Sequence, residues 1–78
     1  MTFRRLGPGP ETRLCAGSGG CPDLFELEDG DFAIIGQDIT AKAQAELPTD
    51  AGCAPDERII RVPRRLLVDA RADIPSSL

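Results

Sequence analysis

The sequence contains no histidine, tryptophan or tyrosine, so phenylalanine supplies all of its aromatic side chains. Without histidine, the chain by itself builds no Ser-His-Asp or Cys-His catalytic site, no His-ligated zinc site and no histidine pH switch. A chain of 78 residues also leaves little room for a substrate pocket of several hundred Å³. We therefore expect a protein that is not an enzyme and that uses no cofactor.

Long apolar segments are missing as well. The N-terminus is basic, but the apolar run of a signal peptide does not follow it. No apolar run approaches the roughly 20 residues that span a bilayer. These absences lead us to expect a cytoplasmic protein that has no membrane partner.

Cysteine is scarce and odd in number, with Cys15, Cys21 and Cys53 as the full set. An odd count in a cytoplasmic chain does not indicate a disulfide framework. The glycine-rich loop between Cys15 and Cys21 is flexible enough to bring both sulfurs to one metal ion. Structural zinc sites favour closely spaced ligand pairs, however, and no second pair follows. We favour unreactive thiols, and a metal- or redox-responsive role of the three cysteines stays open as an alternative.

The length of the chain indicates one domain with a thin core, because a chain of this size buries only about 60–65% of its unfolded surface. Five glycines and three prolines make residues 1–22 irregular, apart from a short strand around residues 3–6. Residues 23–74 are expected to form a single small α+β domain, and residues 75–78 a tail. A partner, or a second copy in a homo-oligomer, is the expected additional source of stability.

Residues 24–35 carry the strongest structural signal. Two segments rich in apolar residues flank Asp29-Gly30, a pair typical of two-residue type I′ hairpin turns. In that register the facing pairs are Glu28 with Asp31, Leu27 with Phe32, and Phe25 with Ile34. The pattern therefore predicts a hairpin with one apolar and one acidic face.

The rest of the chain completes a predicted α+β fold. Good helix formers predict a short helix over 40–47, with Thr40 as its N-cap, and Pro63 suits the first position of a helix over 63–72. Strands over 24–28, 31–39 and 57–62 form a three-stranded antiparallel sheet, and Gly36 marks a bulge or the end of regular pairing. The two helices cover its apolar face. The predicted core consists of Phe25, Leu27, Phe32, Ile34, Ile60, Val62, Leu66 and Leu67.

The net charge of −4 is distributed unevenly. Residues 1–21 carry three arginines and one glutamate, residues 22–57 ten acids and one lysine, and residues 58–78 five arginines and two aspartates. The net charges of these segments are therefore +2, −9 and +3. One interpretation is internal: Arg61 pairs with Glu26 or Glu28 across the sheet. A second is a basic strand-helix corner that contacts an anionic partner, formed by Arg58, Arg61, Arg64 and Arg65. A third is solvated charge that has no partner.

Two stretches together resemble a known group of proteins. The first runs from Cys21-Pro22 through Phe25-Glu26 to Ile39-Thr40, and the second contains Val62-Pro63 and Leu66-Leu67. This pattern resembles small actinobacterial proteins whose genes often lie beside helix-turn-helix regulators. It covers about two thirds of the chain. The resemblance implies a cytoplasmic, non-catalytic accessory role.

A looser resemblance begins at Arg58. The stretch Arg58–Leu67 is similar to the strand-Pro-helix step of AbrB-type swapped-hairpin transcription factors, which dimerise by strand exchange and contact DNA through arginines near that step. In that family a Gly-Asp turn and another strand follow the helix, whereas here Asp29-Gly30-Asp31 precedes it. The resemblance implies that the four arginines of the corner contact DNA.

We therefore expect a non-enzymatic protein-interaction module, accessory to a transcriptional regulator, that contacts another protein or a second copy of itself. A sheet edge or the basic corner is the expected contact surface. Two alternatives stay open. The first is a small dimeric DNA-binding regulator that uses the four arginines, and the second is the metal- or redox-responsive cysteine protein.

Overall fold

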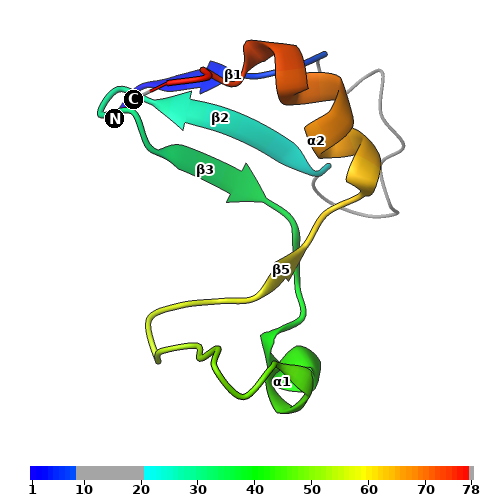
Figure 1. Cartoon of the computed structure of the whole chain (residues 1–78). Helices are drawn as coiled ribbons and strands as arrows, with labels where there is room; N and C mark the ends of the chain where they lie inside the picture. The colour runs from blue at the N-terminus through cyan, green and yellow to red at the C-terminus, as the bar shows by residue number, and fades with distance from the viewer. Residues whose placement is uncertain (9–20, 78) are drawn as a thin grey trace.

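The structure is a computed structural model that describes residues 1–8 and 21–77. An antiparallel sheet has the order β1-β2-β3, with β1 at Phe3–Arg5, β2 at Asp23–Leu27 and β3 at Phe32–Ile35. A separate two-stranded ribbon consists of β4 (Gln37–Asp38) and β5 (Ile60–Arg61). The helical elements are α1 (Thr40–Ala43), the 3₁₀ turn η2 (Gln44–Glu46), α2 (Arg64–Ala70) and the 3₁₀ turn η3 (Arg71–Asp73). The predicted class, a three-stranded antiparallel sheet with a short connecting helix and a C-terminal helix, is confirmed (Figure 1).

The third strand of the sheet comes from the N-terminus and not from residues 57–62. β1 pairs with β2 in a register that places Arg4 opposite Glu26. β5 pairs instead with β4, and Arg61 lies opposite Gln37. The prediction of residues 57–62 as the third strand is wrong because the chain leaves the sheet after Ile35, and β1 occupies the edge of β2 that β3 leaves open.

The β2–β3 hairpin is one residue out of the predicted register. Its loop contains residues 28–30, because the Leu27 N–H donates to the Asp31 carbonyl at 2.8 Å and the Gly30 N–H donates to the Leu27 carbonyl at 3.0 Å. Gly30 has φ 95°, the left-handed conformation found at the end of three-residue hairpin loops. The predicted two-residue turn at Asp29-Gly30 is therefore wrong.

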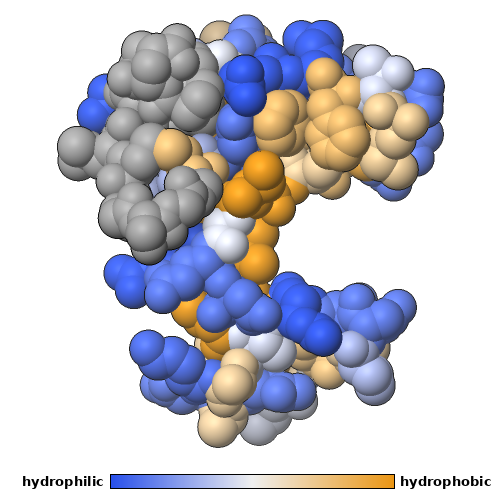
Figure 2. Space-filling model, turned by 180° about the vertical axis from the view of Figure 1, so that it is seen from behind, coloured by the Kyte–Doolittle hydropathy of each residue, from blue (hydrophilic) through white to orange (hydrophobic). Residues whose placement is uncertain are grey.

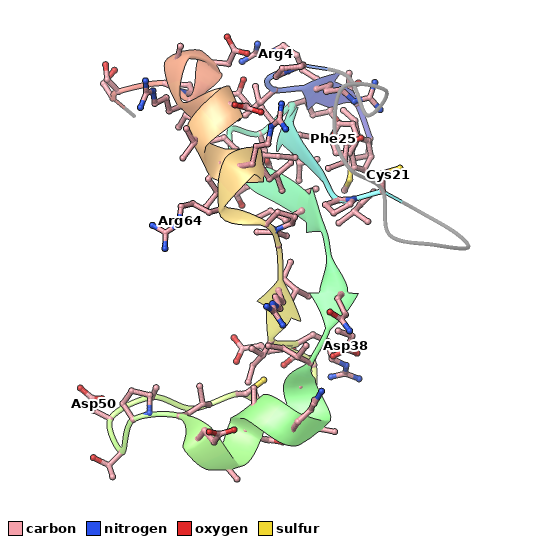
Figure 3. The ribbon with its side chains drawn as sticks, turned by 90° about the vertical axis from the view of Figure 1, so that its right-hand side faces the viewer. Arg4, Cys21, Phe25, Asp38, Asp50 and Arg64 are labelled. Carbon is pink, nitrogen blue, oxygen red and sulfur yellow. The ribbon has the colours of Figure 1, made fainter. Side chains whose placement is uncertain are left out.

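This shift of one residue changes which side chains share a face of the sheet. On the side of α2, which packs on β2, the facing pairs are Leu24 with Ile34 and Glu26 with Phe32. On the other side, Phe25 lies opposite Ala33. Figure 3 shows Phe25 on the side of the sheet away from α2. The predicted division into one apolar and one acidic face is wrong, because both faces carry apolar side chains.

The core lies between the sheet and α2 and is small. Among the residues that the structure describes, four apolar side chains are buried, namely Leu6 (0% exposed), Leu24 (2%), Leu66 (1%) and Ala70 (0%). Val62 and Ile74 pack against them. Of the eight residues predicted for the core, Leu66 is buried, Phe25, Leu27 and Val62 are half-buried, and Phe32, Ile34, Ile60 and Leu67 are exposed. The prediction is wrong at the exposed positions because Ile60 lies on the ribbon outside the sheet and α2 packs mainly on β2, which leaves Phe32 and Ile34 of β3 uncovered. Leu67 is exposed because α2 packs through Leu66 and Ala70.

The C-terminal helix begins one residue later than predicted. Pro63 is its N-cap, with an extended ψ of 143°, and α2 continues through η3 to Asp73. A carboxylate oxygen of Asp73 accepts the Gly7 N–H at 2.8 Å, which fixes the end of the helix against the chain after β1. In the described part of the chain, no helix is long and apolar enough to cross a membrane.

The ribbon connects two parts of unequal size (Figure 1). The body consists of the sheet and α2, and the arm consists of residues 39–59 with α1, η2 and the loop to β5. Figure 2 shows the molecule hollowed between body and arm. The radius of gyration is 13.9 Å, against about 11.5 Å for a compact domain of this length. The projecting arm accounts for this expanded shape.

Candidate functional site

The four arginines of the predicted basic corner lie on two elements. Arg58 precedes β5 and Arg61 belongs to it, whereas Arg64 and Arg65 begin α2. All four are exposed. The corner is therefore a line of cations along the ribbon and the start of the helix.

Two of these arginines are engaged by carboxylates of the chain itself. The Arg65 Nε donates to Oδ2 of Asp69, one helical turn later, at 3.1 Å. The Arg58 Nε lies 3.9 Å from Oδ2 of Asp38, and its Nη1 donates to two backbone carbonyls of the preceding loop. Exposed pairs of this kind contribute little stability, but they reduce the charge that Arg58 and Arg65 present to a partner.

Arg61 and Arg64 carry the remaining positive charge of the corner. Within residues 1–8 and 21–77, neither has an ion-pair partner. Figure 3 shows the Arg64 side chain pointing away from the body. Arg61 borders a small hollow of about 160 Å³ on the arm, lined also by Ile39, Lys42, Ala43 and Glu46.

The cation that pairs with Glu26 comes from β1. The Arg4 Nε donates to Oε1 of Glu26 at 3.1 Å, and the Arg4 Nη2 contacts the same oxygen. The prediction that Arg61 faces Glu26 or Glu28 is therefore wrong, because β5 lies outside the sheet. The signal that sequence reasoning missed is the Arg4-Arg5 pair, which complements the acidic residues of β2.

Arg5 lies between a carboxylate and an aromatic ring. Its Nε donates to Oδ1 and Oδ2 of Asp23 at 3.2 and 3.1 Å, and its guanidinium carbon lies 5.2 Å from the centre of the Phe25 ring. Asp23 is 5% exposed and also accepts the Leu24 N–H at 3.0 Å. Phe3 meets Phe25 edge to face, with ring centres 5.3 Å apart. These contacts hold β1 against β2 on the side away from α2.

An apolar surface is left on this side of the sheet, which we call the open face. Its members, by cross-strand pairing, are Phe3, Phe25, Leu27, Ala33 and Ile35. Phe3 and Ile35 are each 51% exposed, and the other three are half-buried. Figure 2 views the molecule from this side and shows apolar residues from the sheet into the bend of the molecule. The described part of the chain places no helix over this face (Figures 1 and 3).

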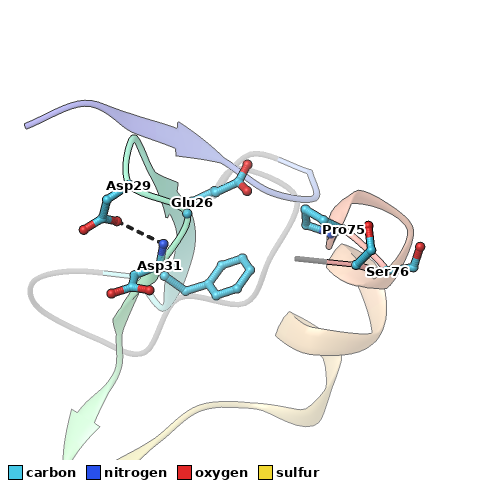
Figure 4. A pocket seen from close by; sticks show the side chains of 8 residues that line it. Glu26, Asp29, Asp31, Pro75 and Ser76 are labelled. Atoms are coloured by element: carbon cyan, nitrogen blue, oxygen red, sulfur yellow. Dashed lines mark hydrogen bonds between the residues drawn. The ribbon is translucent and has the colours of Figure 1, made fainter.

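The hairpin turn borders a hollow of about 520 Å³ that faces the C-terminal tail (Figure 4). Its lining consists of Glu26, Asp29, Gly30, Asp31, Phe32, Pro75, Ser76 and Ser77. Asp29 stabilises the turn, because its Oδ1 accepts the Asp31 N–H at 3.0 Å. Among the residues that the structure describes, no group of three or more acidic, cysteine or histidine side chains is arranged to hold a metal ion.

Asp38 fixes the start of the arm. Its Oδ1 accepts the Thr40 hydroxyl at 2.7 Å and the Thr40 N–H at 3.0 Å. These hydrogen bonds, and then the nearby Arg58 guanidinium, lower the pKa of Asp38 against the opposing effect of desolvation. The Thr40 oxygen in turn accepts the Ile59 N–H at 2.8 Å. The prediction of Thr40 as N-cap is wrong: Ile39 is the N-cap, and Thr40 is the first residue of α1.

The cysteines do not form a set of three free thiols. Cys21 is disulfide-bonded, so the favoured interpretation of unreactive thiols is wrong for this residue. Cys53 is a half-buried free thiol on the arm, and its Sγ lies 3.4 Å from the Glu57 carbonyl oxygen. Cys15 lies outside the described residues. Because its sulfur is oxidised, Cys21 is not a thiolate ligand in this structure.

No family model, curated protein or solved structure matches this chain. The resemblances to small actinobacterial proteins and to AbrB-type factors therefore stay predictions. The functional assignment rests on the surfaces described above, of which the open face is the one with no helix over it in the described part of the chain.

Proposed function

We propose that this chain is a non-enzymatic protein-interaction module, accessory to a transcriptional regulator. The observation that carries the proposal is the open face, where Phe3 and Ile35 are each 51% exposed beside three half-buried apolar side chains. Contiguous exposed apolar surface on a small protein is typical of an interaction site. Apolar side chains that are scattered singly over a protein surface do not gather on one face of a sheet, as these five do.

The composition of the open face favours a protein partner. Protein interfaces are enriched in aromatic residues and arginine, with an apolar centre and a polar rim. Here Phe25 lies on the central strand and contacts Phe3 of the edge strand, and the Arg5–Asp23 pair supplies a polar neighbour. Because the β1–β2 contacts hold these side chains in place, little conformational freedom is lost when a partner binds.

The class of partner comes from the sequence resemblance, which implies a helix-turn-helix regulator. The charge distribution is compatible with such a partner, since the acidic middle of the chain, at −9, would be attracted to the basic surface of a DNA-binding protein. On this proposal the chain acts on transcription through the regulator and not through its own contacts with DNA.

The DNA-binding alternative has weaker support. Arg58 and Arg65 are each paired with a carboxylate, which leaves Arg61 and Arg64 for phosphate contacts. Affinity for DNA grows with the number of phosphates neutralised, and the net charge of −4 opposes it. A mobility shift with random duplex DNA at low salt that disappears in the Arg61→Ala, Arg64→Ala variant would favour this alternative.

A pull-down from native lysate tests the proposal. The immobilised chain is compared with Ile35→Glu, which places a charge on the open face, and with Leu67→Glu, which places one at a similarly exposed position of α2 (46%, against 51% for Ile35). The expected result is recovery of a helix-turn-helix regulator by the natural chain and by Leu67→Glu, and about tenfold less by Ile35→Glu. Recovery of no regulator, or equal recovery by all three, contradicts the proposal.

A further inference from the structure

The outer edge of β3 presents backbone groups that no described residue bonds. The Leu27 N–H donates to the Asp31 carbonyl, and hydrogen-bonded pairs alternate along an antiparallel ladder. Counting along the strand from this pair, Ala33 and Ile35 are the residues whose backbone groups bond β2. The N–H and C=O groups of Phe32 and Ile34 therefore point outward, away from β2. β3 is the end strand of the sheet, and Figure 1 shows it facing the concave side of the molecule.

The two edges of the sheet differ in how they are protected. β1, at one edge, is three residues long and carries Arg4 and Arg5, and short charged edge strands resist pairing with another chain. β3, at the other edge, has the sequence Phe-Ala-Ile-Ile and no charge. Phe32, Ile34 and Ile35 on it are 43%, 42% and 51% exposed. An uncharged, exposed edge strand is a template for strand addition.

We propose that a second copy of this chain binds at the β3 edge, forming a two-fold symmetric dimer with a continuous six-stranded antiparallel sheet. The outward groups of Phe32 and Ile34 then bond Ile34 and Phe32 of the other copy. Ala33 lies opposite its own counterpart on the two-fold axis, as a non-hydrogen-bonded pair. This register is self-complementary, which a two-fold interface requires.

The charges around the strand fit this register. With Ala33 on the axis, Gly36 of one copy lies opposite Gly30 of the other, whose neighbours are Asp29 and Asp31. The Arg61 backbone lies beside Gly36, because a Cβ placed on the glycine would be 2.8 Å from the Arg61 carbonyl oxygen. The Arg61 side chain is exposed and has no ion-pair partner among the described residues, so it is free to extend from β5 toward the acidic turn of the other copy, and symmetry repeats this arrangement.

The small core of the single chain is consistent with a dimer. Among the described residues it contains four buried apolar side chains. A second sheet on the concave side adds hydrogen bonds and covers apolar edge residues. The inference does not rest on the proposed function, because the dimer uses the outward backbone groups of β3, whereas the proposed function uses side chains of the open face, which include Ala33 and Ile35 of the same strand. Pairing at the edge leaves both open faces available.

Disulfide trapping tests the register in the full chain with Cys53→Ser as background. Directly opposed residues of a non-hydrogen-bonded antiparallel pair have Cα atoms about 4.5 Å apart, within disulfide reach. Ala33→Cys should therefore cross-link to its counterpart under mild oxidation. The matched control is Ile35→Cys, on the same strand and face. Its counterpart lies four positions along the strand, about 13 Å away, and should not cross-link.

The proposed dimer is supported if analytical ultracentrifugation shows a dimer at sub-millimolar concentration, and if Ala33→Cys cross-links rapidly while Ile35→Cys does not. A monomer under these conditions, or cross-linking of Ile35→Cys as fast as Ala33→Cys, overturns it. A dimer that binds no regulator would contradict the proposed function alone, and a monomer that binds one would contradict the dimer alone.

Charge exchange gives a second, independent readout of the dimer. Arg61→Asp and Asp31→Arg should each weaken dimerisation about tenfold, because each places like charges together at both symmetric contacts. The variant with both substitutions should recover most of the lost affinity. Single variants that dimerise as well as the natural chain would overturn the Arg61 contact. So would a double variant whose loss of dimerisation free energy equals the sum of the losses of the two single variants.

Discussion

Gly36 lies so close to Arg61 that a Cβ on the glycine would be 2.8 Å from the Arg61 carbonyl oxygen. The same Cβ would lie 2.7 Å from Cγ1 of Val62. The absent side chain lets the strand pass from the sheet into the ribbon while β5 lies alongside. This contact explains why pairing with β2 ends at Ile35 and why the arm leaves the body at this point.

Gly36→Ala should therefore destabilise the fold by about 1–3 kcal/mol, because the new methyl group overlaps backbone that has little room to move. Urea unfolding measures the change in free energy. Gly52→Ala is the matched control, since a Cβ there meets nothing within 4 Å, and it should change stability by less than about 1 kcal/mol. Equal effects of the two substitutions would contradict the close packing of β4 and β5.

Leu66→Ala should cost about 2–5 kcal/mol of unfolding free energy, because Leu66 is 1% exposed in a core of four side chains. Its neighbour Leu67 is 46% exposed, so Leu67→Ala should cost less than about 1 kcal/mol. Urea or thermal unfolding of both variants checks this difference. A larger loss at Leu67 would show that α2 packs on the sheet through a different face.

Asp38 should make the stability of the arm depend on pH. Its hydrogen bonds to Thr40 lower its pKa in the folded state, so the ionised carboxylate stabilises the fold above the unfolded pKa of about 3.9. This contribution is lost as the pH falls through the folded-state pKa. Asp38→Asn should therefore melt at a lower temperature than the natural chain at neutral pH, and the difference should disappear in strong acid.

Thermal unfolding followed by circular dichroism at several pH values measures this effect. Asp50→Asn is the control for removal of a charge from the same arm, because Asp50 makes no side-chain hydrogen bond within the described structure. A difference between Asp38→Asn and the natural chain that persists unchanged at low pH would show that the carboxylate charge does not stabilise α1.

Local patterns in the sequence predicted the parts of the fold that depend on neighbouring residues. The hairpin around Gly30, the interruption at Gly36 and the helix after Pro63 are all present, although their boundaries shift by one or a few residues. Turn residues, helix formers and proline act within a few positions of themselves, so their effects are visible in sequence.

Long-range pairing could not be predicted in the same way. Choosing β1 over residues 57–62 as the third strand depends on which segment reaches the free edge of β2, and both segments carry arginines that suit its acidic residues. The choice between a two- and a three-residue loop at Gly30 decides every facing pair in the hairpin. The open face depends on the pairing of β1 with β2 and on the three-residue loop. Because neither was predicted, the sequence did not indicate Phe3 and Ile35 as candidate contact residues.

The most direct test of the central claim is a binding titration between the purified chain and a helix-turn-helix regulator that the pull-down recovers. The account predicts saturable binding by the natural chain, about tenfold weaker binding by the Ile35→Glu variant, and unchanged binding by Leu67→Glu. No binding by the natural chain, or equal affinity of the natural chain and Ile35→Glu, would contradict a role of the open face in recognising a regulator.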